Sequence, residues 1–460
     1  MRRRVVGIET EYGLTAASTT TEHVDMDADH AARYLFQPLL QRGRTSNVFL
    51  RNGGRLYLDV GSHPEYATAE CDRLEDLLAQ DRAGSAMLAD MATEGDAIIA
   101  QAGIPARLHL FRNNLDSEGN SYGCHENYLL HRRRDFREVA DALVSFFITR
   151  QVVAGSGYIR PGSGRPKYCF SQRADQMWDA ISSATTRSRP IINTRDEPLA
   201  DSGSFRRMHV IVGDTNVAEP TTALKVAITE LLLEAVEDGV RIQDLALAEP
   251  MRAIRDINGD LTGSEPVELA DGRRMSAVQI QREIKRRVLE TVEVSGDLHN
   301  YAVDLWERGL NAVESGDWSS IETELDFAIK HKLLTSYQAR SGAALDDARL
   351  RRLELSYHEI TSQGLLERME RGGMVTRLTT PEQIDVARTI PPQTTRAKMR
   401  GRAIAAAEDH RRDITVDWVH VRLDDDTHST VALQDPLANE DPRVDALVDQ
   451  ITQGASELPA

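Results

Sequence analysis

The sequence is poor in cysteine and lacks long hydrophobic runs. Its 460 residues include three widely spaced cysteines, Cys71, Cys124 and Cys169, and no C-x-x-C pair. Neither a disulfide framework nor a zinc-binding cysteine motif is therefore indicated. No segment approaches the ~20 apolar residues of a membrane-spanning helix. The apolar run behind Met1 is short and soon reaches Glu9, which argues against a signal peptide. We therefore expect a cytoplasmic protein.

The chain also lacks an excess of positive charge. It has 72 Asp and Glu against 55 Lys and Arg, a net charge of −17. General nucleic-acid binding needs a basic surface, so this balance argues against that class, although it does not exclude a local basic groove. The length allows two or three domains, or one large domain with a small appendage.

Common motifs of nucleotide hydrolases and serine hydrolases are missing as well. The glycine-rich segments 155–157 and 162–164 are not followed by G-K-[ST], so they are interpreted as flexible loops rather than a P-loop. There is no G-x-S-x-G motif, and the cysteines have no evident histidine partner. A Walker ATPase or an ordinary serine hydrolase is not expected.

The most informative segment that is present is a strand predicted over residues 55–60. Its period of two puts Arg55, Tyr57 and Asp59 on one face and three apolar residues on the other. Glu65 follows after a predicted turn. A guanidinium group suits phosphate, and separated carboxylates suit a hard cation such as Mg²⁺. This face is typical of a nucleotide and metal site on a sheet.

A second pair of carboxylates lies on the strand predicted over residues 4–15. Glu9 and Glu11 share one face there. Like charges at this spacing repel unless a cation lies between them or one is solvated, and both interpretations stay open. If this strand and the 55–60 strand are neighbours, Glu9 would converge with Tyr57 and Glu65.

Two further polar clusters carry possible chemistry. In a loop predicted around residues 121–127, His125, Glu126 and Asn127 could bind metal or nucleotide, or form a hydrogen-bonded turn. Five arginines lie within residues 187–207. Arginine prefers bidentate oxyanion partners, so this cluster indicates a phosphate or the carboxylates of an acidic partner.

The pattern of elements predicts an α+β fold with a mostly antiparallel sheet, flanked by helices, and a small C-terminal domain. A Thr- and Pro-rich passage over residues 378–392 marks the boundary. The main expected elements are helices at 31–40, 72–102 (N-cap Asp72), 222–238, 275–366 (almost wholly helical) and 395–407, and strands at 107–111, 208–212, 414–423 and 430–433. Trp418, on one of these strands, is by default a core residue.

Several long blocks resemble the Pup–protein ligase family (PafA). They are residues 7–13, 52–71, 120–129, 182–198, 206–216 and 415–420. The resemblance covers essentially the whole chain. It implies a large domain like glutamine synthetase and γ-glutamyl-cysteine synthetase over residues 1–390. It also implies a small C-terminal domain over residues 391–460 that closes the nucleotide site.

The resemblance also implies an activity. Members join the γ-carboxylate of the C-terminal glutamate of Pup to lysine amines of target proteins, through a γ-glutamyl phosphate made with ATP and Mg²⁺, which marks the targets for proteasomal degradation. Pup and lysine-bearing proteins are the implied partners, with no nucleic acid and no membrane. Matched residue by residue, the implied magnesium ligands are Glu9, Tyr57 and Glu65, the ATP contacts Arg55, Thr68 and Trp418, and the catalytic base Asp59. On this interpretation Trp418 faces the nucleotide pocket.

The alternative is the related depupylase, which hydrolyses the Pup–lysine bond. The form of the 59–68 and 182–190 motifs and the short connection before Asn52 favour the ligase. A silent Pup-binding module is disfavoured because Asp59 and all the implied ligands are present. Leu199 and Phe327 depart from the family pattern of His and Trp, and we expect neither to touch the site.

Overall fold

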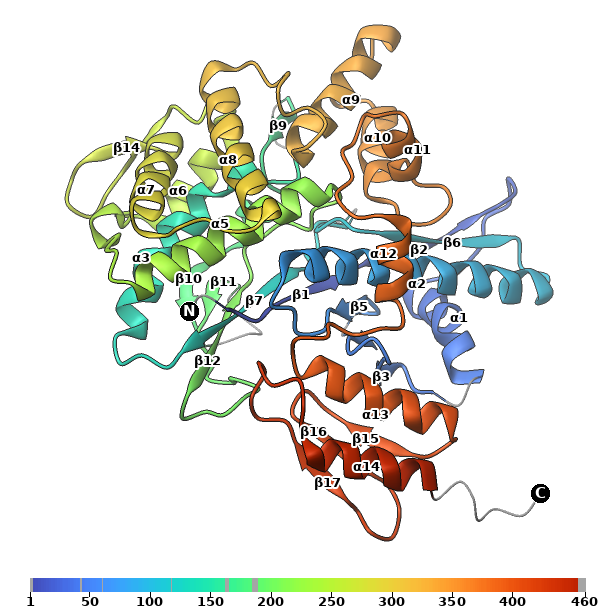
Figure 1. The fold of residues 1–460 in the computed structure, drawn as a ribbon. Coiled ribbons are helices and arrows are strands. Elements are labelled where there is room, and N and C mark those ends of the chain that lie inside the picture. The colour runs from blue at the N-terminus through green and yellow to red at the C-terminus, as the bar shows by residue number, and fades with distance from the viewer. Residues whose placement is uncertain are drawn as a thin grey trace.

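A twisted sheet of eight strands forms the centre of the computed structural model (Figure 1). The structure describes residues 3–41, 44–59, 61–116, 118–161, 165–183 and 189–453. Neighbouring strands pair antiparallel, except for the parallel pair β10–β11. In spatial order the strands are β10 (Asp179–Ser182), β11 (Pro190–Asn193), β12 (Phe205–Val210), β7 (Cys124–His131), β1 (Val6–Glu11), β5 (Pro64–Ala67), β4 (Arg55–Leu58) and β3 (Asn47–Phe49). The predicted α+β class with a mostly antiparallel sheet is confirmed.

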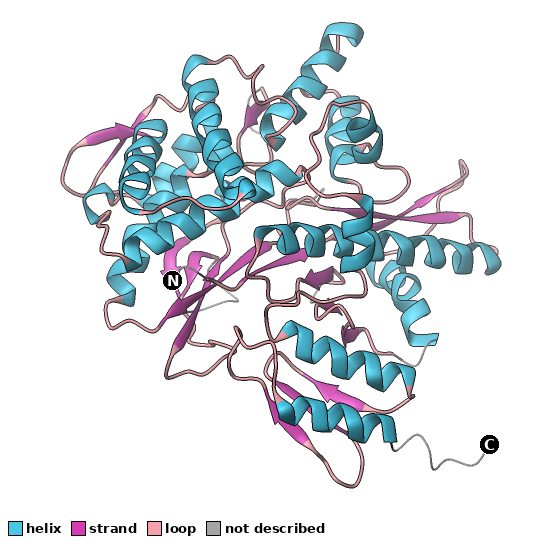
Figure 2. Ribbon diagram, viewed as in Figure 1, coloured by secondary structure: helices cyan, strands magenta, loops and turns pink. Residues whose placement is uncertain are grey.

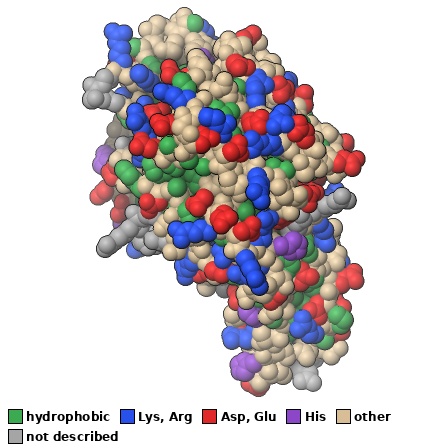
Figure 3. Space-filling view, turned by 90° about the vertical axis from the view of Figure 1, so that its left-hand side faces the viewer, with side chains coloured by type: hydrophobic (Ala, Val, Ile, Leu, Met, Phe, Trp, Pro, Cys, Tyr) green, Lys and Arg blue, Asp and Glu red, His purple; other side chains and the backbone are tan. Residues whose placement is uncertain are grey.

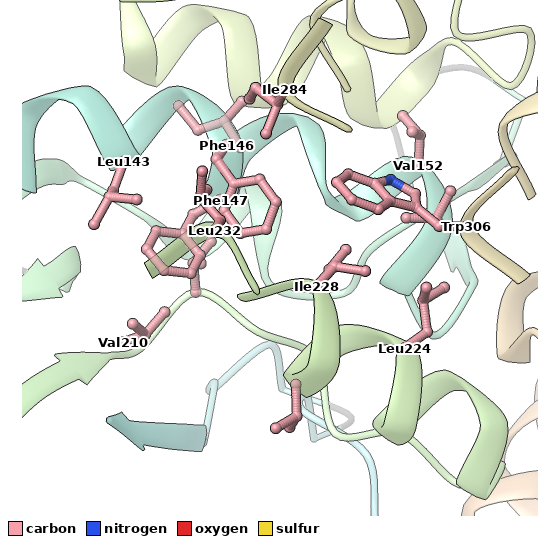
Figure 4. Close-up of a cluster of buried hydrophobic side chains, with 14 of the residues drawn as sticks. Leu143, Phe146, Phe147, Val152, Val210, Leu224, Ile228, Leu232, Ile284 and Trp306 are labelled. Atoms are coloured by element: carbon pink, nitrogen blue, oxygen red, sulfur yellow. The ribbon is translucent and has the colours of Figure 1, made fainter. Parts of the chain in front are cut away.

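Helices pack against one face of the sheet (Figures 1 and 2). The opposite face carries half-buried polar side chains, among them Glu9 and Glu11 of β1. The largest apolar core joins the helix-covered face to α3 (Phe136–Thr149), α5 (Glu219–Glu237), α7 (Ala277–Thr291) and α8 (Asp297–Ser315). Figure 4 shows Phe146 and Phe147 of α3 packed with Ile228 of α5 and with Val210 of β12. Full burial of each such side chain contributes about 1.5–3 kcal/mol. The core therefore fixes the strands that present the polar face.

The first predicted strand is divided in two. β1 belongs to the main sheet, whereas β2 (Gly13–Ser18) pairs with β6 (Ala106–Phe111). The break falls at Tyr12, whose side chain is buried and whose N–H bonds to the Pro64 carbonyl at 2.8 Å. A side chain at Gly13 would collide with the Tyr122 hydroxyl, so only glycine fits this bend. Glu9 and Glu11 both remain on β1.

A second core lies under the β4–β5 end of the sheet. It packs α1 (Ala28–Gln41) and α2 (Leu74–Gln101) around Tyr66 of β5. The predicted N-cap of α2 is wrong, because the cap residue is Arg73 and its side chain makes no capping hydrogen bond. The Asp72 carboxylate instead accepts hydrogen bonds from Arg3 and Thr394, so it ties the C-terminal part of the chain to the sheet.

The remaining elements lie on the helical side of the molecule. The predicted helical block 275–366 is confirmed in outline. Helix α5 ends at Glu237, and Gly239 just beyond it has a positive φ, as expected after a helix C-terminus. The further helices and strands are α4 (Gln151–Ala154), α6 (Pro250–Gly259), α9 (Asp326–Ser341), α10 (Ala348–His358), α11 (Leu366–Arg371), α12 (Pro381–Ala387), β8 (Tyr158–Arg160), β9 (Lys167–Cys169), β13 (Pro266–Glu268), β14 (Arg274–Ser276), and the 3₁₀ helices η1 (Ala174–Gln176) and η2 (Gln243–Leu245).

The C-terminal part of the chain builds its own small core. There α13 (Ala397–Asp409) and α14 (Pro442–Gln453) cover a three-stranded sheet of β15 (Ile414–Val416), β16 (His420–Leu423) and β17 (Thr430–Ala432). The single strand predicted at 414–423 is wrong. The chain turns back at Asp417, whose carboxylate accepts hydrogen bonds from the N–H groups of Val419 and His420, both at 2.6 Å. Trp418 therefore lies in a hairpin turn.

The surface agrees with the mixed composition. On the face shown in Figure 3, acidic and basic side chains are interspersed. The C-terminal unit, from α13 to α14 (residues 397–453), projects below the rest of the molecule. Within the described part of the chain, no helix combines the length and the apolar character needed to cross a membrane.

Candidate active site

The open face of the sheet gathers the predicted acidic residues. The register pairs Glu11 of β1 with Glu65 of β5, and Glu65 with Tyr57 of β4. On the other side of β1, Glu9 pairs with His125 of β7. The strand carrying Tyr57 is thus not the direct neighbour of β1, because β5 lies between them. The sequence pattern placed Glu65 after a predicted turn and indicated no separate strand β5 there.

Close contacts join these side chains. The Tyr57 hydroxyl donates a hydrogen bond to Glu9, and His125 Nδ1 lies 3.3 Å from the other Glu9 oxygen. His125 Nε2 lies 3.7 Å from Glu11, which also accepts a hydrogen bond from the Gly123 N–H at 2.9 Å. The residues predicted as magnesium ligands therefore occupy one continuous network on the sheet.

Burial and charge perturb the carboxyl groups of this network strongly. Burial, together with the negative charges of Glu9 and Glu11, raises the pKa of Glu65 to about 11. Burial also opposes ionisation of Glu9, but its hydrogen bond to His125 and the charge of that ring more than offset this, and its pKa falls well below the ordinary range. The network thus holds more carboxyl groups than it can ionise together, which is the situation a bound cation relieves.

The sequence pattern did not single out His209, which belongs to the same face. It pairs in register with Asn127, and its ring lies 5.0 Å from the ring of His125. Burial, with the charges of His125 and Arg207, lowers the pKa of His209 to about 3. Candidate ligand atoms of Glu9, His125 and His209 lie within 4.8 Å of one another. Alternation along the predicted 208–212 strand was the signal that could have placed His209 here.

The predicted loop around His125 is wrong. Residues 124–131 form β7, a central strand of the sheet. His125 and Asn127 therefore face the site, whereas Glu126 points to the opposite side, where it is fully buried and pairs with Arg150 at 2.6 Å. Glu126 helps to hold the helical core and does not belong to the site.

Asp59 lies beyond the end of β4. The strand ends at Leu58 rather than at residue 60, and Val60 lies outside the described residues. Asp59 is exposed, and its N–H bonds to the His63 carbonyl at 2.9 Å. Gly61 and Ser62 both have positive φ, 88° and 61°, so the chain folds back tightly into β5. Asp59 is therefore accessible, two residues beyond Tyr57 at the end of β4.

A pocket opens beside the acidic network and encloses about 650 Å³, part of it open to solvent. Thr68 and Trp418 both line it, and the Thr68 hydroxyl accepts a hydrogen bond from the Ile8 N–H at 3.1 Å. Arg55 lies further along β4, with its guanidinium carbon 4.4 Å from the centre of the Tyr57 ring. Trp418 thus faces a pocket, and the default interpretation as a core residue is wrong.

Leu199 also lines this pocket, with a left-handed backbone (φ 50°). The expectation that it lies away from the predicted site is therefore wrong. Sequence distance concealed this, because the segment after β11 returns to the sheet next to Pro436 of the C-terminal unit. Phe327 instead packs against Phe170 and Trp318 in the helical core.

The arginines of residues 187–207 do not act as one patch. Arg187 lies outside the described residues. Arg207 lines the pocket, and its Nη1 donates to Asn127 at 2.7 Å. The adjacent Arg206 points the other way, over the Phe136 ring at 4.2 Å. Arg189 donates to the carbonyl of Ser121 at 3.1 Å, and Arg195 pairs with Glu197 at the surface.

Comparison with known proteins shows the family of the chain. A sequence model of the family described as "Pup-ligase protein" matches residues 4–422. The chain belongs to this family. It is 53% identical over 459 residues to the curated Pup–protein ligase of Xylanimonas cellulosilytica, an alignment that covers 98% of this chain and all of the relative. It is 50% identical over 451 residues to the Pup–protein ligase of Mycolicibacterium smegmatis, covering 97% and 99% of the two chains.

Two solved structures share the fold. One is the complex between the prokaryotic ubiquitin-like protein Pup and its ligase PafA, with a TM-score of 0.92, 42% identity, and 99% and 94% of the two chains covered. The other is the Pup ligase PafA in complex with ADP, with a TM-score of 0.84, 43% identity, and 94% and 96% covered. The fold of this chain is therefore that of a Pup ligase, as the sequence resemblance predicted.

Proposed function

We propose that this protein is an ATP-dependent ligase that joins the γ-carboxylate of the C-terminal glutamate of Pup to lysine amines of target proteins. The observation that carries this proposal is its 53% identity to a Pup–protein ligase over that relative's whole length. The joined bond marks targets for proteasomal degradation. The reaction consumes ATP, so we place it in the cytoplasm, where ATP is available.

We further propose that Glu9, Tyr57 and Glu65 hold Mg²⁺. The donor set supports this assignment, since two carboxylates and a phenol oxygen are hard ligands on one sheet face. The surplus of carboxyl groups around Glu65 also suits a divalent cation. When bound there, Mg²⁺ would neutralise phosphate charge during transfer. His125 supports the site by holding the Glu9 carboxylate in place.

The pocket beside this network would receive the nucleotide. We assign Arg55, Thr68 and Trp418 as ATP contacts, and add Arg207 on the phosphate side because its guanidinium lines the pocket next to Asn127. We propose residues 391–460 as the domain that closes the site. Trp418, at its hairpin turn, supplies one wall of the pocket.

Amide formation from a free carboxylate needs a better leaving group than oxide. Transfer of the ATP γ-phosphoryl group to the Pup glutamate would supply it as an acyl phosphate, with Arg55 and Arg207 stabilising the charge that develops. The attacking lysine has an ordinary pKa near ~10.4 and must lose a proton. We propose Asp59 as the base, because it is exposed and follows Tyr57 by two residues at the end of β4.

A conjugation assay tests this function directly. The purified protein is mixed with Pup ending in glutamate, ATP, Mg²⁺ and a lysine-bearing protein, and mass shifts are followed on a gel. A new Pup-sized adduct that requires ATP establishes the ligase. Failure to form an adduct, together with release of Pup from a preformed conjugate, would instead establish the depupylase.

A further inference from the structure

A buried cluster of charges joins the sheet to the C-terminal unit at the wall of the nucleotide pocket, where Glu70 and Arg396 both line it. Glu70 follows β5 and is two residues beyond Thr68. Its carboxylate accepts hydrogen bonds from Arg396 Nε at 2.8 Å and from Arg400 Nη1 at 3.0 Å, and pairs with Arg400 Nη2 as well. Both arginines belong to the start of α13, and the Thr395 hydroxyl donates to the Glu70 carbonyl at 2.7 Å. One carboxylate thus fixes the orientation of two guanidinium groups.

Arg400 connects this cluster to Trp418. Its guanidinium carbon lies 5.0 Å from the centre of the Trp418 ring and 5.4 Å from that of Phe49, and the two rings meet edge to face at 4.9 Å. Nη1 also donates to the Trp418 carbonyl at 3.2 Å, and Nη2 donates to the Gly53 carbonyl at 2.8 Å. The Arg400 side chain is fully buried. It therefore contacts the ring and the backbone of Trp418 from behind the pocket.

Trp418 needs such a support because its own segment is only a turn. The Asp417 N–H bonds to the His420 carbonyl at 3.0 Å and the Leu433 N–H bonds to the Val419 carbonyl at 2.6 Å. These bonds fix the backbone of the turn but not the plane of the half-buried indole ring. A planar guanidinium over the indole ring gives a cation–π contact and a preferred ring plane. A base that stacks on Trp418 would bind more tightly when that plane is already set.

We propose that Arg400, held by Glu70, is a positioning residue that orients Trp418 for nucleotide binding. This inference rests on the proposed function for the identity of the nucleotide. A merely structural Arg400 would hold the C-terminal unit in place without a selective effect on nucleotide affinity. The distinguishing property is that the effect of Arg400 passes through the Trp418 ring.

A double-mutant cycle tests this dependence. Arg400→Lys keeps the positive charge beside Glu70 but removes the planar fork that makes four hydrogen bonds, to Glu70, Gly53 and Trp418. We expect KM for ATP and Kd for ADP to rise about tenfold, with kcat at saturating ATP within about threefold and KM for Pup unchanged. In a Trp418→Ala background, the same substitution should change ADP affinity less than about twofold.

The controls separate positioning from folding. Arg402→Lys, on the same helix but partly exposed and paired with Asp445, should leave ADP affinity unchanged. If Arg400→Lys does not fold, Arg400→Gln replaces it, because its planar amide keeps a hydrogen-bonding group beside Glu70 but removes the cation from the Trp418 ring. Unchanged ADP affinity in the folded variant, or equal effects with and without Trp418, would overturn the proposal. Because ADP titration does not require conjugation, failure of the ligase assay would be recognised separately.

Discussion

At the scale of single residues, the chemistry of the site depends on neighbours from other strands. Glu65 is an ordinary carboxyl group by its place in the sequence, yet burial and the charges of Glu9 and Glu11 raise its pKa to about 11. Glu9, on the same sheet face, has a lowered pKa because His125 lies beside it. Two identical side chains therefore have opposite tendencies, which is typical of catalytic and metal sites.

The assignment of Asp59 as base leads to a first prediction. Asp59→Asn has nearly the same shape but cannot accept the lysine proton, so conjugation should fall about 10²- to 10⁴-fold while ADP affinity stays unchanged. Single-turnover conjugation and ADP titration measure the two quantities. The control is Asp90→Asn on α2, where Asp90 forms an ion pair with Arg388. This variant should behave as wild type. Full conjugation by Asp59→Asn would remove this assignment.

Arg207 and Arg206 offer a matched pair for a second prediction. Arg207 lines the nucleotide pocket, whereas Arg206 stacks on Phe136 outside it. Arg207→Gln should raise KM for ATP or lower kcat, with a combined loss of about 10- to 100-fold in kcat/KM for ATP, because one phosphate contact is lost. Arg206→Gln should change kcat/KM less than about twofold. Equal losses in both variants would show a general electrostatic effect instead.

At the scale of elements, close packing of α2 on β5 fixes the position of the strand that carries Glu65 of the acidic network. Gly84 of α2 faces the ring of Tyr66, and a Cβ there would lie 2.1 Å from a ring carbon. Tyr66 has no room to withdraw, because it is buried and its hydroxyl bonds to Asn52 and Gln80 at 2.9 and 3.1 Å. Tyr66 is adjacent to Glu65 in β5, so its contact with α2 helps to hold the strand that presents Glu65 to the site.

This packing gives a third prediction. Gly84→Ala should lower the free energy of unfolding by about 1–3 kcal/mol, or more, because the added methyl group overpacks a core that cannot relax. Gly203→Ala is the matched control, since its nearest neighbour, an Asp201 oxygen, lies at an ordinary 3.6 Å. Thermal unfolding followed by circular dichroism compares the two variants. A melting temperature for Gly84→Ala equal to that of Gly203→Ala would contradict the overpacking argument.

Most elements could be predicted from local patterns, and the failures have physical causes. Helix α5 was predicted within a few residues because its apolar period and Gly239 act locally. β7 was read as a loop because Gly123 and the polar His125 face a site rather than a core. The 414–423 hairpin was read as one strand because its turn is made by Asp417 capping two N–H groups, without glycine or proline.

At the scale of the whole molecule, buried charge joins the C-terminal unit to the sheet. Glu70 of the sheet lies between Arg396 and Arg400 of α13. Burial disfavours the ionised form of the Glu70 carboxyl group. The charges and hydrogen bonds of the two arginines more than offset this effect, so the pKa of Glu70 falls from an ordinary 4.5 to about 2. The two units are therefore coupled by an interaction that depends on pH.

The sign of this dependence gives a fourth prediction. Because the folded-state pKa of Glu70 is lowered, its stabilisation is complete above pH 4.5 and is lost as the pH falls toward 2, by about 3 kcal/mol. Glu70→Gln should therefore be less stable at pH 7 and lose less further stability between pH 5 and pH 2.5 than wild type. Thermal midpoints over this range measure the difference. Glu440→Gln, at an exposed pair with Lys398, should follow the wild-type curve.

The sequence by itself determined the α+β class, the helical block and, through its long motifs, the ligase family. These depend on periodicity and on contiguous residues, which the chain displays directly. Only the tertiary structure decided that β5 separates the strands of Glu9 and Tyr57, that Arg207 rather than Arg206 lines the pocket, and that Leu199 and Trp418 share it. Each of these depends on strand order and on packing between segments far apart in the chain, which local spacing does not encode.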